Sequence, residues 1–152
     1  MKIIIAWIGK TKEPAIQALT EEYLRRISRH AEVAGLALKD EAAILSLARG
    51  EGQNKDRRNK ERYKLVLLDS RGKQLSSEEF AEFIEREHLS AMPLLFAIGG
   101  SDGFSQEARL GAGFTLSLGK MTLPHELARV VLVEQIYRAF TILKNHPYHL
   151  GH

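Results

Sequence analysis

Short, wholly apolar runs alternate along the chain with longer stretches in which apolar residues recur every three or four positions. The first run, from Ile3 to Ile8, is apolar at every position and is typical of a parallel strand that is covered on both faces. In the stretch that follows, Ile16, Leu19, Tyr23 and Ile27 share one face of a helix. The chain therefore begins with a strand and an amphipathic helix.

The same alternation continues through the rest of the chain. It predicts strands at residues 2–8, 31–38, 65–69, 94–98 and 115–118, a helix from Pro14, helices at 41–49, 77–89 and 124–144, and a short helix capped by Ser105. Strands that alternate with helices are typical of an α/β fold with a mostly parallel sheet flanked by helices. Because no repeat or linker divides the chain, we expect residues 1–152 to form a single domain.

Two segments depart from this pattern. The helix at 124–144 is apolar around most of its circumference, so we expect the core to cover one side and a second subunit to cover the other. Residues 53–64, QNKDRRNKERYK, contain six basic and two acidic side chains and almost no apolar ones. They predict a surface loop or a solvated helix.

Composition excludes several classes of protein. The chain has no cysteine, which excludes disulfides, thiolate zinc sites, iron–sulfur clusters and a cysteine nucleophile. The opening apolar run is far shorter than the ~20 residues of a membrane span and lacks a signal-peptide cleavage site, so we expect a cytoplasmic protein with no membrane partner. The net charge of +3 is compatible with a nucleic-acid partner but is modest.

Candidate chemistry lies where the predicted strands end, because ligands of open α/β sheets bind at the carboxyl ends of the strands. Asp69 ends one strand, and its carboxylate either accepts hydrogen bonds from ribose hydroxyls or an amine, or caps a turn before Arg71 and Gly72. The segment IGGSDGF, residues 98–104, follows another strand. Its glycines either let the backbone approach a ligand or form only a tight turn, and they match neither the dinucleotide motif nor a P-loop.

The C-terminal third supplies two more candidates. Gly119 and residues 120–123 lie between a strand and the long helix, where backbone groups could hold an adenine. The segment NHPYH, residues 145–149, collects titratable side chains, although a disordered tail with incidental histidines explains it equally well. No histidine pair with metal-ligand spacing lies beside a carboxylate in a helix, so we expect no metal.

Several of these segments together resemble a known family. FAIGGSDGF, LSLGKMTLPHELARVVLVEQIYRAF, NHPYH and EEYLRRI resemble the ribosomal RNA large-subunit methyltransferase H (RlmH) family of the SPOUT class, and the similarity runs from Met1 to His149. The resemblance implies a homodimer with a C-terminal trefoil knot. It also implies methyl transfer from S-adenosyl-L-methionine to N3 of a pseudouridine in 23S ribosomal RNA, within the large subunit or the whole ribosome.

The resemblance also implies site residues. It places the cofactor at Leu68, Gly99, Leu118, Gly119, Lys120, Met121, Thr122 and Leu123. As a hypothesis, His149 or His146 acts as base or hydrogen-bonding partner of the target, and Tyr148 stacks on it or bonds to it. Arg129 and Arg138 are expected to contact phosphate or the other subunit. The family tends to carry a basic residue where this chain has Leu150, and His152 is a partial substitute.

Three alternatives stay open at this point. The first is a SPOUT enzyme that acts on transfer RNA, and the second is an RNA- or nucleotide-binding module without catalysis. Affinity for S-adenosyl-L-methionine separates an enzyme from a binding module. The third, a dinucleotide-dependent oxidoreductase, is disfavoured because the chain lacks both the G-x-G-x-x-G motif and an acidic residue at the expected offset.

Overall fold

The computed structural model describes residues 1–51 and 61–150. Its elements, in chain order, are β1 Lys2–Ile8, α1 Pro14–Ile27, β2 Glu32–Leu38, α2 Glu41–Ala48, β3 Lys64–Gln74, α3 Ser77–Ser90, β4 Leu94–Ile98, α4 Gln106–Gly111, β5 Phe114–Ser117, α5 His125–Leu143 and the 3-10 turn η1 Pro147–His149. The predicted alternation of strands and helices is confirmed. Residues 52–60, most of the basic segment, and His152 lie outside the described residues, so the predictions for them stay untested.

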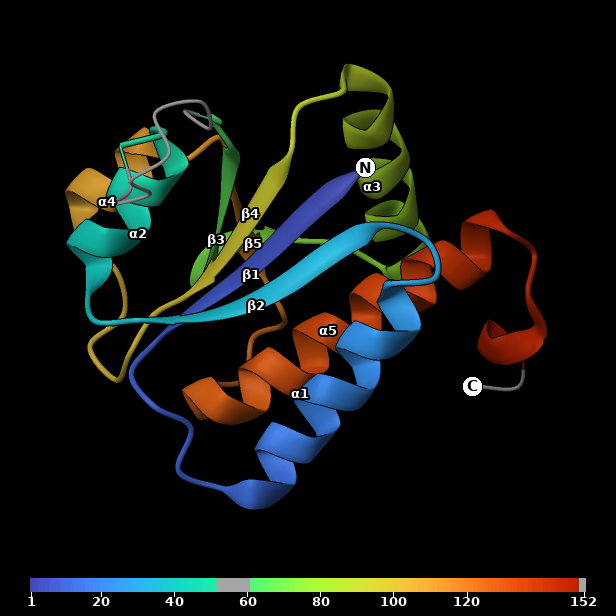
Figure 1. Ribbon diagram of the computed structural model, residues 1–152, viewed down its shortest axis with the longest axis horizontal. Coiled ribbons are helices and arrows are strands. Elements are labelled where there is room, and N and C mark those ends of the chain that lie inside the picture. The colour runs from blue at the N-terminus through green and yellow to red at the C-terminus, as the bar shows by residue number, and fades with distance from the viewer. Residues whose placement is uncertain (52–60, 151–152) are drawn as a thin grey trace.

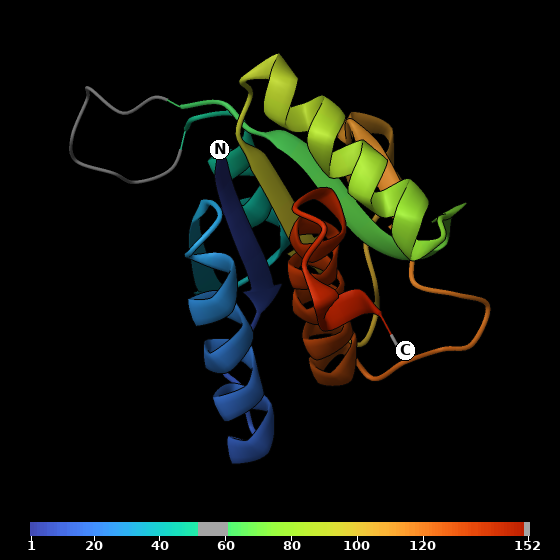
Figure 2. The same ribbon diagram turned by 90° about the vertical axis from the view of Figure 1, so that its right-hand side faces the viewer.

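The strands form one five-stranded sheet in the order β2-β1-β4-β3-β5, and every neighbouring pair is parallel. This confirms the α/β fold with a parallel sheet. Helices α1, α3 and α5 cover one face, and the shorter α2 and α4 cover the other (Figures 1 and 2). Because all strands are parallel, their carboxyl ends meet at one edge of the sheet, where a ligand site is expected.

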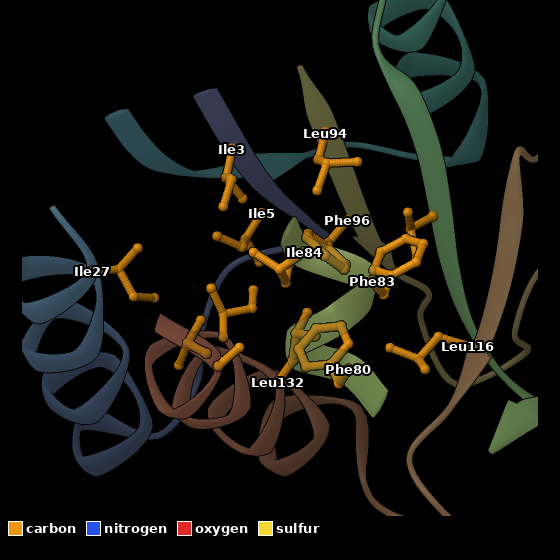
Figure 3. Close-up of a cluster of buried hydrophobic side chains, with 14 of the residues drawn as sticks. Ile3, Ile5, Ile27, Phe80, Phe83, Ile84, Leu94, Phe96, Leu116 and Leu132 are labelled. Atoms are coloured by element: carbon orange, nitrogen blue, oxygen red, sulfur yellow. The ribbon is translucent and has the colours of Figure 1, made fainter. Parts of the chain in front are cut away.

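Alternate side chains of the strands supply two separate hydrophobic clusters. Ile3, Ile5 and Phe96 point to the face covered by α1, α3 and α5, where they pack with Ile84 and Leu132 (Figure 3). The intervening strand residues join Ile44 of α2 and Ala108 of α4 on the other face. Both faces are therefore buried, which is why β1 has no polar position between its apolar ones.

Strand β3 is longer than predicted, because it continues past Leu68 to Gln74. Its register with β5 shifts between Leu68 and Lys73, so residues 69–72 form an irregularity within the strand. A Cβ atom on Gly72 would lie 2.6 Å from the backbone oxygen of Thr115. The chain is irregular at Arg71 and Gly72 without leaving the sheet, and glycine permits the close approach to β5.

Replacing Gly72 by alanine is expected to lower the free energy of unfolding by about 1–3 kcal/mol, because a backbone oxygen cannot move away from the new methyl group as a flexible side chain could. Chemical denaturation measures this effect. Gly111→Ala is the matched control, since nothing lies within 4 Å of a Cβ atom there. Equal stability of the two variants would show that β5 does not pack against this bend.

The prediction that the core covers one side of helix α5 is confirmed. Leu132, Val133 and Ile136 are buried in the core, whereas Leu127 near the start of the helix remains 46% exposed. Leu19 of α1, predicted on the apolar face, is likewise 44% exposed. Both helices thus present apolar surface that the rest of the described chain does not cover. Within residues 1–51 and 61–150, no helix is long and apolar enough to span a bilayer.

Candidate active site

A cavity of about 360 Å³ lies at the carboxyl ends of β4 and β5 and beside the irregular part of β3, where residues 68–71 line it. Seven of the eight residues predicted to hold a cofactor line it: Leu68, Gly99, Leu118, Gly119, Met121, Thr122 and Leu123. Lys120 is exposed and is not among the lining residues. Three segments that lie far apart in the sequence therefore form one site, as their positions after parallel strands predicted.

The glycine-rich segment after β4 forms one wall of this cavity. Gly103 has a φ of +69° and donates a backbone hydrogen bond of 3.1 Å to Gly100, so the segment is a tight turn. A Cβ atom on Gly99 would lie 3.2 Å from the Phe104 ring and 3.3 Å from the Gly103 carbonyl carbon. The turn and the close approach of backbone to the cavity are both present, so the two interpretations of this segment do not compete.

Asp69 lines the same cavity, but its carboxylate is already occupied. Oδ1 accepts hydrogen bonds of 2.9 Å from the backbone N and from Nε of Arg71, and Oδ2 accepts one of 3.0 Å from Nη2. These bonds to Arg71 hold the pKa of the Asp69 carboxyl below its ordinary value. The local capping role is the one the structure displays, within a strand irregularity and not in a turn.

Ser117 fixes the bend at Gly119, in the segment between β5 and α5 that lines another side of the cavity. Its hydroxyl donates to the backbone oxygen of Gly119 at 2.9 Å and accepts from the Gly119 backbone N at 3.2 Å. Gly119 has a φ of +142°, a conformation that side chains rarely adopt. Beyond this bend, the Met121 side chain is 85% exposed at the rim of the cavity. The segment before α5 thus presents backbone groups and apolar side chains to a ligand.

The predicted substrate-side residues form a second cluster near the end of α5. The Tyr148 hydroxyl donates to Oε1 of Glu134 at 3.1 Å and lies 3.2 Å from the Tyr23 hydroxyl of α1. Arg138 donates to the same carboxylate through Nε at 3.0 Å, and its guanidinium lies 5.3 Å from the centre of the Tyr148 ring. Sequence reasoning missed Tyr23 and Glu134, because their contacts with Tyr148 join segments that are separate in the sequence.

The two histidines of this cluster, His146 and His149, differ in the hydrogen bonding of Nδ1. Nδ1 of His146 accepts a hydrogen bond of 3.1 Å from the backbone N of Tyr148, whereas Nδ1 of His149 is buried without a hydrogen-bond partner among the described residues. Burial, together with Tyr23 and Glu134, raises the pKa of the Tyr148 hydroxyl above its ordinary value. Tyr148 therefore stays protonated at neutral pH.

The cavity and this second cluster do not meet within one chain. Ala128 at the start of α5 lines the cavity, whereas Tyr148 contacts Glu134 and Arg138 in the later half of the helix. The 19 residues of α5 span roughly 28 Å. The turn η1 follows the far end of the helix and folds back against it, so that the Tyr148 ring packs on Tyr137. The structure thus brings the predicted cofactor residues together and keeps the predicted substrate-side residues apart from them.

Arg129 does not fit its expected role in contacting phosphate or another subunit. Its side chain is 1% exposed, lies 4.0 Å from the Trp7 ring centre, and donates from Nη1 to Oγ1 of Thr11 at 2.7 Å. A guanidinium buried in this way cannot reach an external phosphate, so that expectation is wrong. As for metal ions, no group of three or more His, Asp or Glu side chains in the described ranges could hold one.

Comparisons with known proteins agree with this geometry. Residues 1–149 match the family described as "Predicted SPOUT methyltransferase". "Ribosomal RNA large subunit methyltransferase H" of Koribacter versatilis is 53% identical over 100% of both chains. The protein of the same name from Trichlorobacter lovleyi is 47% identical over 98% of this chain and 99% of its own.

A solved structure supports the fold independently of close sequence similarity. It is described as a probable methylase family protein from Haemophilus influenzae, and it covers 96% of this chain and 69% of its own with a TM-score of 0.55 at 15% identity. At that identity the likeness concerns the fold alone. The match over residues 1–149 and the full-length relatives carry the assignment. The chain therefore belongs to the ribosomal RNA large subunit methyltransferase H family of SPOUT methyltransferases.

Proposed function

We propose that the protein transfers a methyl group from S-adenosyl-L-methionine to N3 of a pseudouridine in 23S ribosomal RNA, on the large subunit or the whole ribosome. One observation carries this proposal: seven of the eight residues at which the family resemblance places the cofactor line a single cavity beside three parallel strands. The names of the full-length relatives support ribosomal RNA of the large subunit as the substrate.

The cavity fits such a cofactor in size and in chemistry. Its volume of about 360 Å³ lies in the range of small-molecule sites. Leu68, Leu116 and Leu118 offer apolar surface for an adenine ring, and the backbone at Gly99 and Gly119 offers hydrogen-bonding groups without side chains in the way. When bound, S-adenosyl-L-methionine supplies a methyl group that its sulfonium already activates.

The protein has two remaining tasks, to align the target nitrogen and to accept its proton. Alignment of bound reactants can supply roughly 7–11 kcal/mol of a barrier. His149 is our candidate for the base, because its Nδ1 is committed to no described residue whereas that of His146 accepts from Tyr148. Tyr148, which keeps its proton, would stack on the target base or donate a hydrogen bond to it, with Arg138 beside it.

The distance between cavity and tail leads us to propose a homodimer. Two copies packed antiparallel through α5 would bring η1 of one chain to the cavity of the other. Leu127, 46% exposed on α5, is apolar surface that such packing would cover. The family also implies a trefoil knot around the segment before α5, and ribosomal substrates place the protein in the cytoplasm; both are parts of this proposal.

Blocking the cavity is expected to abolish cofactor binding. A Cβ atom at Gly99 already meets Phe104 and the backbone of Gly103, so a leucine there displaces the turn that lines the cavity. We expect Gly99→Leu to weaken binding of S-adenosyl-L-methionine by on the order of a hundredfold, about 2.7 kcal/mol. Titration calorimetry measures it, with Gly111→Leu as control because that position is open. Unchanged affinity of Gly99→Leu would remove the cavity from the proposal.

The proposed function is tested by methyl transfer from labelled cofactor to three substrates in parallel: naked 23S ribosomal RNA, isolated large subunits and whole ribosomes. We expect label in the ribosomal RNA of assembled particles, because a chain with a net charge of only +3 gains affinity from a preformed RNA–protein surface. Cofactor binding without label in any ribosomal substrate would favour a transfer RNA enzyme. The absence of both would favour the binding module.

A further inference from the structure

The connection between β1 and α1, residues 9–13, is fastened to the start of α5. The backbone N of Lys12 donates a hydrogen bond of 2.6 Å to Oε1 of Glu126, and Oγ1 of Thr11 accepts one of 2.7 Å from Nη1 of Arg129. Figure 1 shows this connection passing beside the first turn of α5. Two side chains of one helix therefore fix the backbone and a side chain of a loop that lies more than a hundred residues earlier.

Burying the guanidinium of Arg129 at this position costs free energy. Arg129 is 1% exposed, burial lowers the pKa of its guanidinium, and its Nε is buried without a hydrogen-bond partner among the described residues. It forms no ion pair within residues 1–51 and 61–150; it makes the hydrogen bond to Thr11 and the contact with the Trp7 ring, and the charge of Glu126 offsets part of the effect of burial on its pKa. Because an apolar side chain of similar volume is often as stable as a buried charge, packing alone does not account for an arginine here.

The fastened loop lies next to the cavity. It follows β1, which pairs with β4, and the Cγ2 atom of Ile8 lies 4.0 Å from a Cβ position on Gly100, a residue of the cavity wall. Lys10 and Lys12 of the loop are both exposed, and neither forms an ion pair with a described residue. Two carboxylates lie at this loop: Glu126 accepts a hydrogen bond from the backbone N of Lys12, and the exposed Glu13 is the last residue of the loop. Neither forms an ion pair with Lys10 or Lys12 in the part of the chain that the structure describes.

We propose that residues 9–13 are a contact for the RNA backbone, in which Lys10 and Lys12 bind phosphates next to the nucleotide being methylated, and that Glu126 and Arg129 are positioning residues for this loop. The inference rests on the proposed function, because it requires RNA to approach the cavity. Two unpaired ammonium groups on a fixed loop match neighbouring phosphates, whose contacts add affinity and salt dependence but no sequence information.

The first test removes both charges. Binding of large ribosomal subunits to wild type and to the Lys10→Ala/Lys12→Ala variant is measured between 50 and 200 mM salt. Loss of two phosphate contacts lowers the slope of log K against log salt by about 1 per contact, so wild type should lose about tenfold more affinity over this range than the variant. The affinity for S-adenosyl-L-methionine and kcat at saturating subunits should stay within twofold of wild type, roughly 0.4 kcal/mol.

Two controls separate this contact from general charge effects. The Lys10→Arg/Lys12→Arg variant keeps both charges and should retain the wild-type slope. Arg86→Ala removes an exposed charge from α3, outside the proposed contact, and should also leave the slope unchanged. If Arg86→Ala lowers the slope as much per charge as the lysine variant does, the effect is net charge and the loop is not a contact.

The second test addresses the positioning residues. Glu126→Ala removes the acceptor of the Lys12 backbone N, whereas Glu126→Gln keeps an acceptor oxygen, so only Glu126→Ala should raise the KM for ribosomal substrate, with kcat at saturation unchanged. Arg129→Met should reduce the salt slope while the free energy of unfolding stays within about 1 kcal/mol of wild type. A purely structural role predicts the opposite, lower stability with an unchanged slope.

The failure of this inference is distinct from the failure of the proposed function. If wild type methylates ribosomal RNA and the Lys10→Ala/Lys12→Ala variant matches its affinity and salt slope, residues 9–13 are not an RNA contact, while the enzyme assignment stands. If wild type neither binds nor methylates any ribosomal substrate, the proposed function fails first. An equal KM for Glu126→Ala and Glu126→Gln would remove the positioning role of Glu126.

Discussion

Two inactive variants, Gly99→Leu and the double variant Tyr148→Phe/His149→Ala, are expected to restore activity when they form a mixed dimer. The first has a blocked cavity and an intact tail, and the second has an intact cavity and a disabled tail. In a mixed dimer, one site combines the intact cavity with the intact tail of the other chain. Random pairing gives half mixed dimers with one working site of two, about a quarter of wild-type activity.

Co-expression with two different affinity tags allows the mixed dimer to be purified and assayed for methyl transfer to ribosomal particles. Each variant paired with itself is the control and should stay inactive. The physical reason is that no residue of the tail lines the cavity of its own chain: the Tyr148 hydroxyl contacts α5 at Glu134, roughly 9 Å along the helix from Ala128 at the cavity. Inactive mixed dimers, with both variants folded and dimeric, would show that cavity and tail of a single chain work together.

Removal of the proposed base is expected to have the second large effect. His149→Ala should lower kcat by ~10²–10⁴-fold near neutral pH, because a positioned base contributes by that factor. Binding of S-adenosyl-L-methionine should be unchanged, since His149 does not line the cavity. Single-turnover methyl transfer measures the chemical step, and calorimetry measures binding.

His146→Ala is the matched comparison, because Nδ1 of His146 is engaged by the backbone of Tyr148 and holds η1 in place. We expect a smaller loss of kcat for this variant, accompanied by a higher KM for ribosomal substrate. If His146→Ala shows the larger loss in kcat and His149→Ala behaves like wild type, the two roles must be exchanged.

The hydrophobic pattern predicted the order of elements because the central strands β1 and β4 are buried on both faces and α1 and α3 each have one apolar face. It did not predict the extension of β3, since residues 69–74 are largely polar and join the sheet only through an irregular pairing with β5. Such pairing depends on the approach of another strand at Gly72, and a local sequence pattern carries no information about that approach.

The residues that line the cavity could be predicted from the sequence, whereas the long-range contacts of Tyr23, Thr11 and Arg129 could not. The cavity residues follow parallel strands, a rule that places them together whatever the rest of the fold. Tyr23 and Thr11 gave no signal, because their partners Tyr148 and Arg129 lie more than a hundred residues away. Arg129 was misjudged for the same reason, since helical spacing does not show that its side chain is buried on Trp7.

The central claim is most directly tested by nucleoside mass spectrometry of 23S ribosomal RNA taken from large subunits and whole ribosomes after incubation with the protein and S-adenosyl-L-methionine. The account predicts one new monomethylated pseudouridine with the methyl group on N3, formed by wild type and absent with Gly99→Leu. No methylated nucleoside in either particle, or a methyl group on a nucleoside other than pseudouridine, would contradict it.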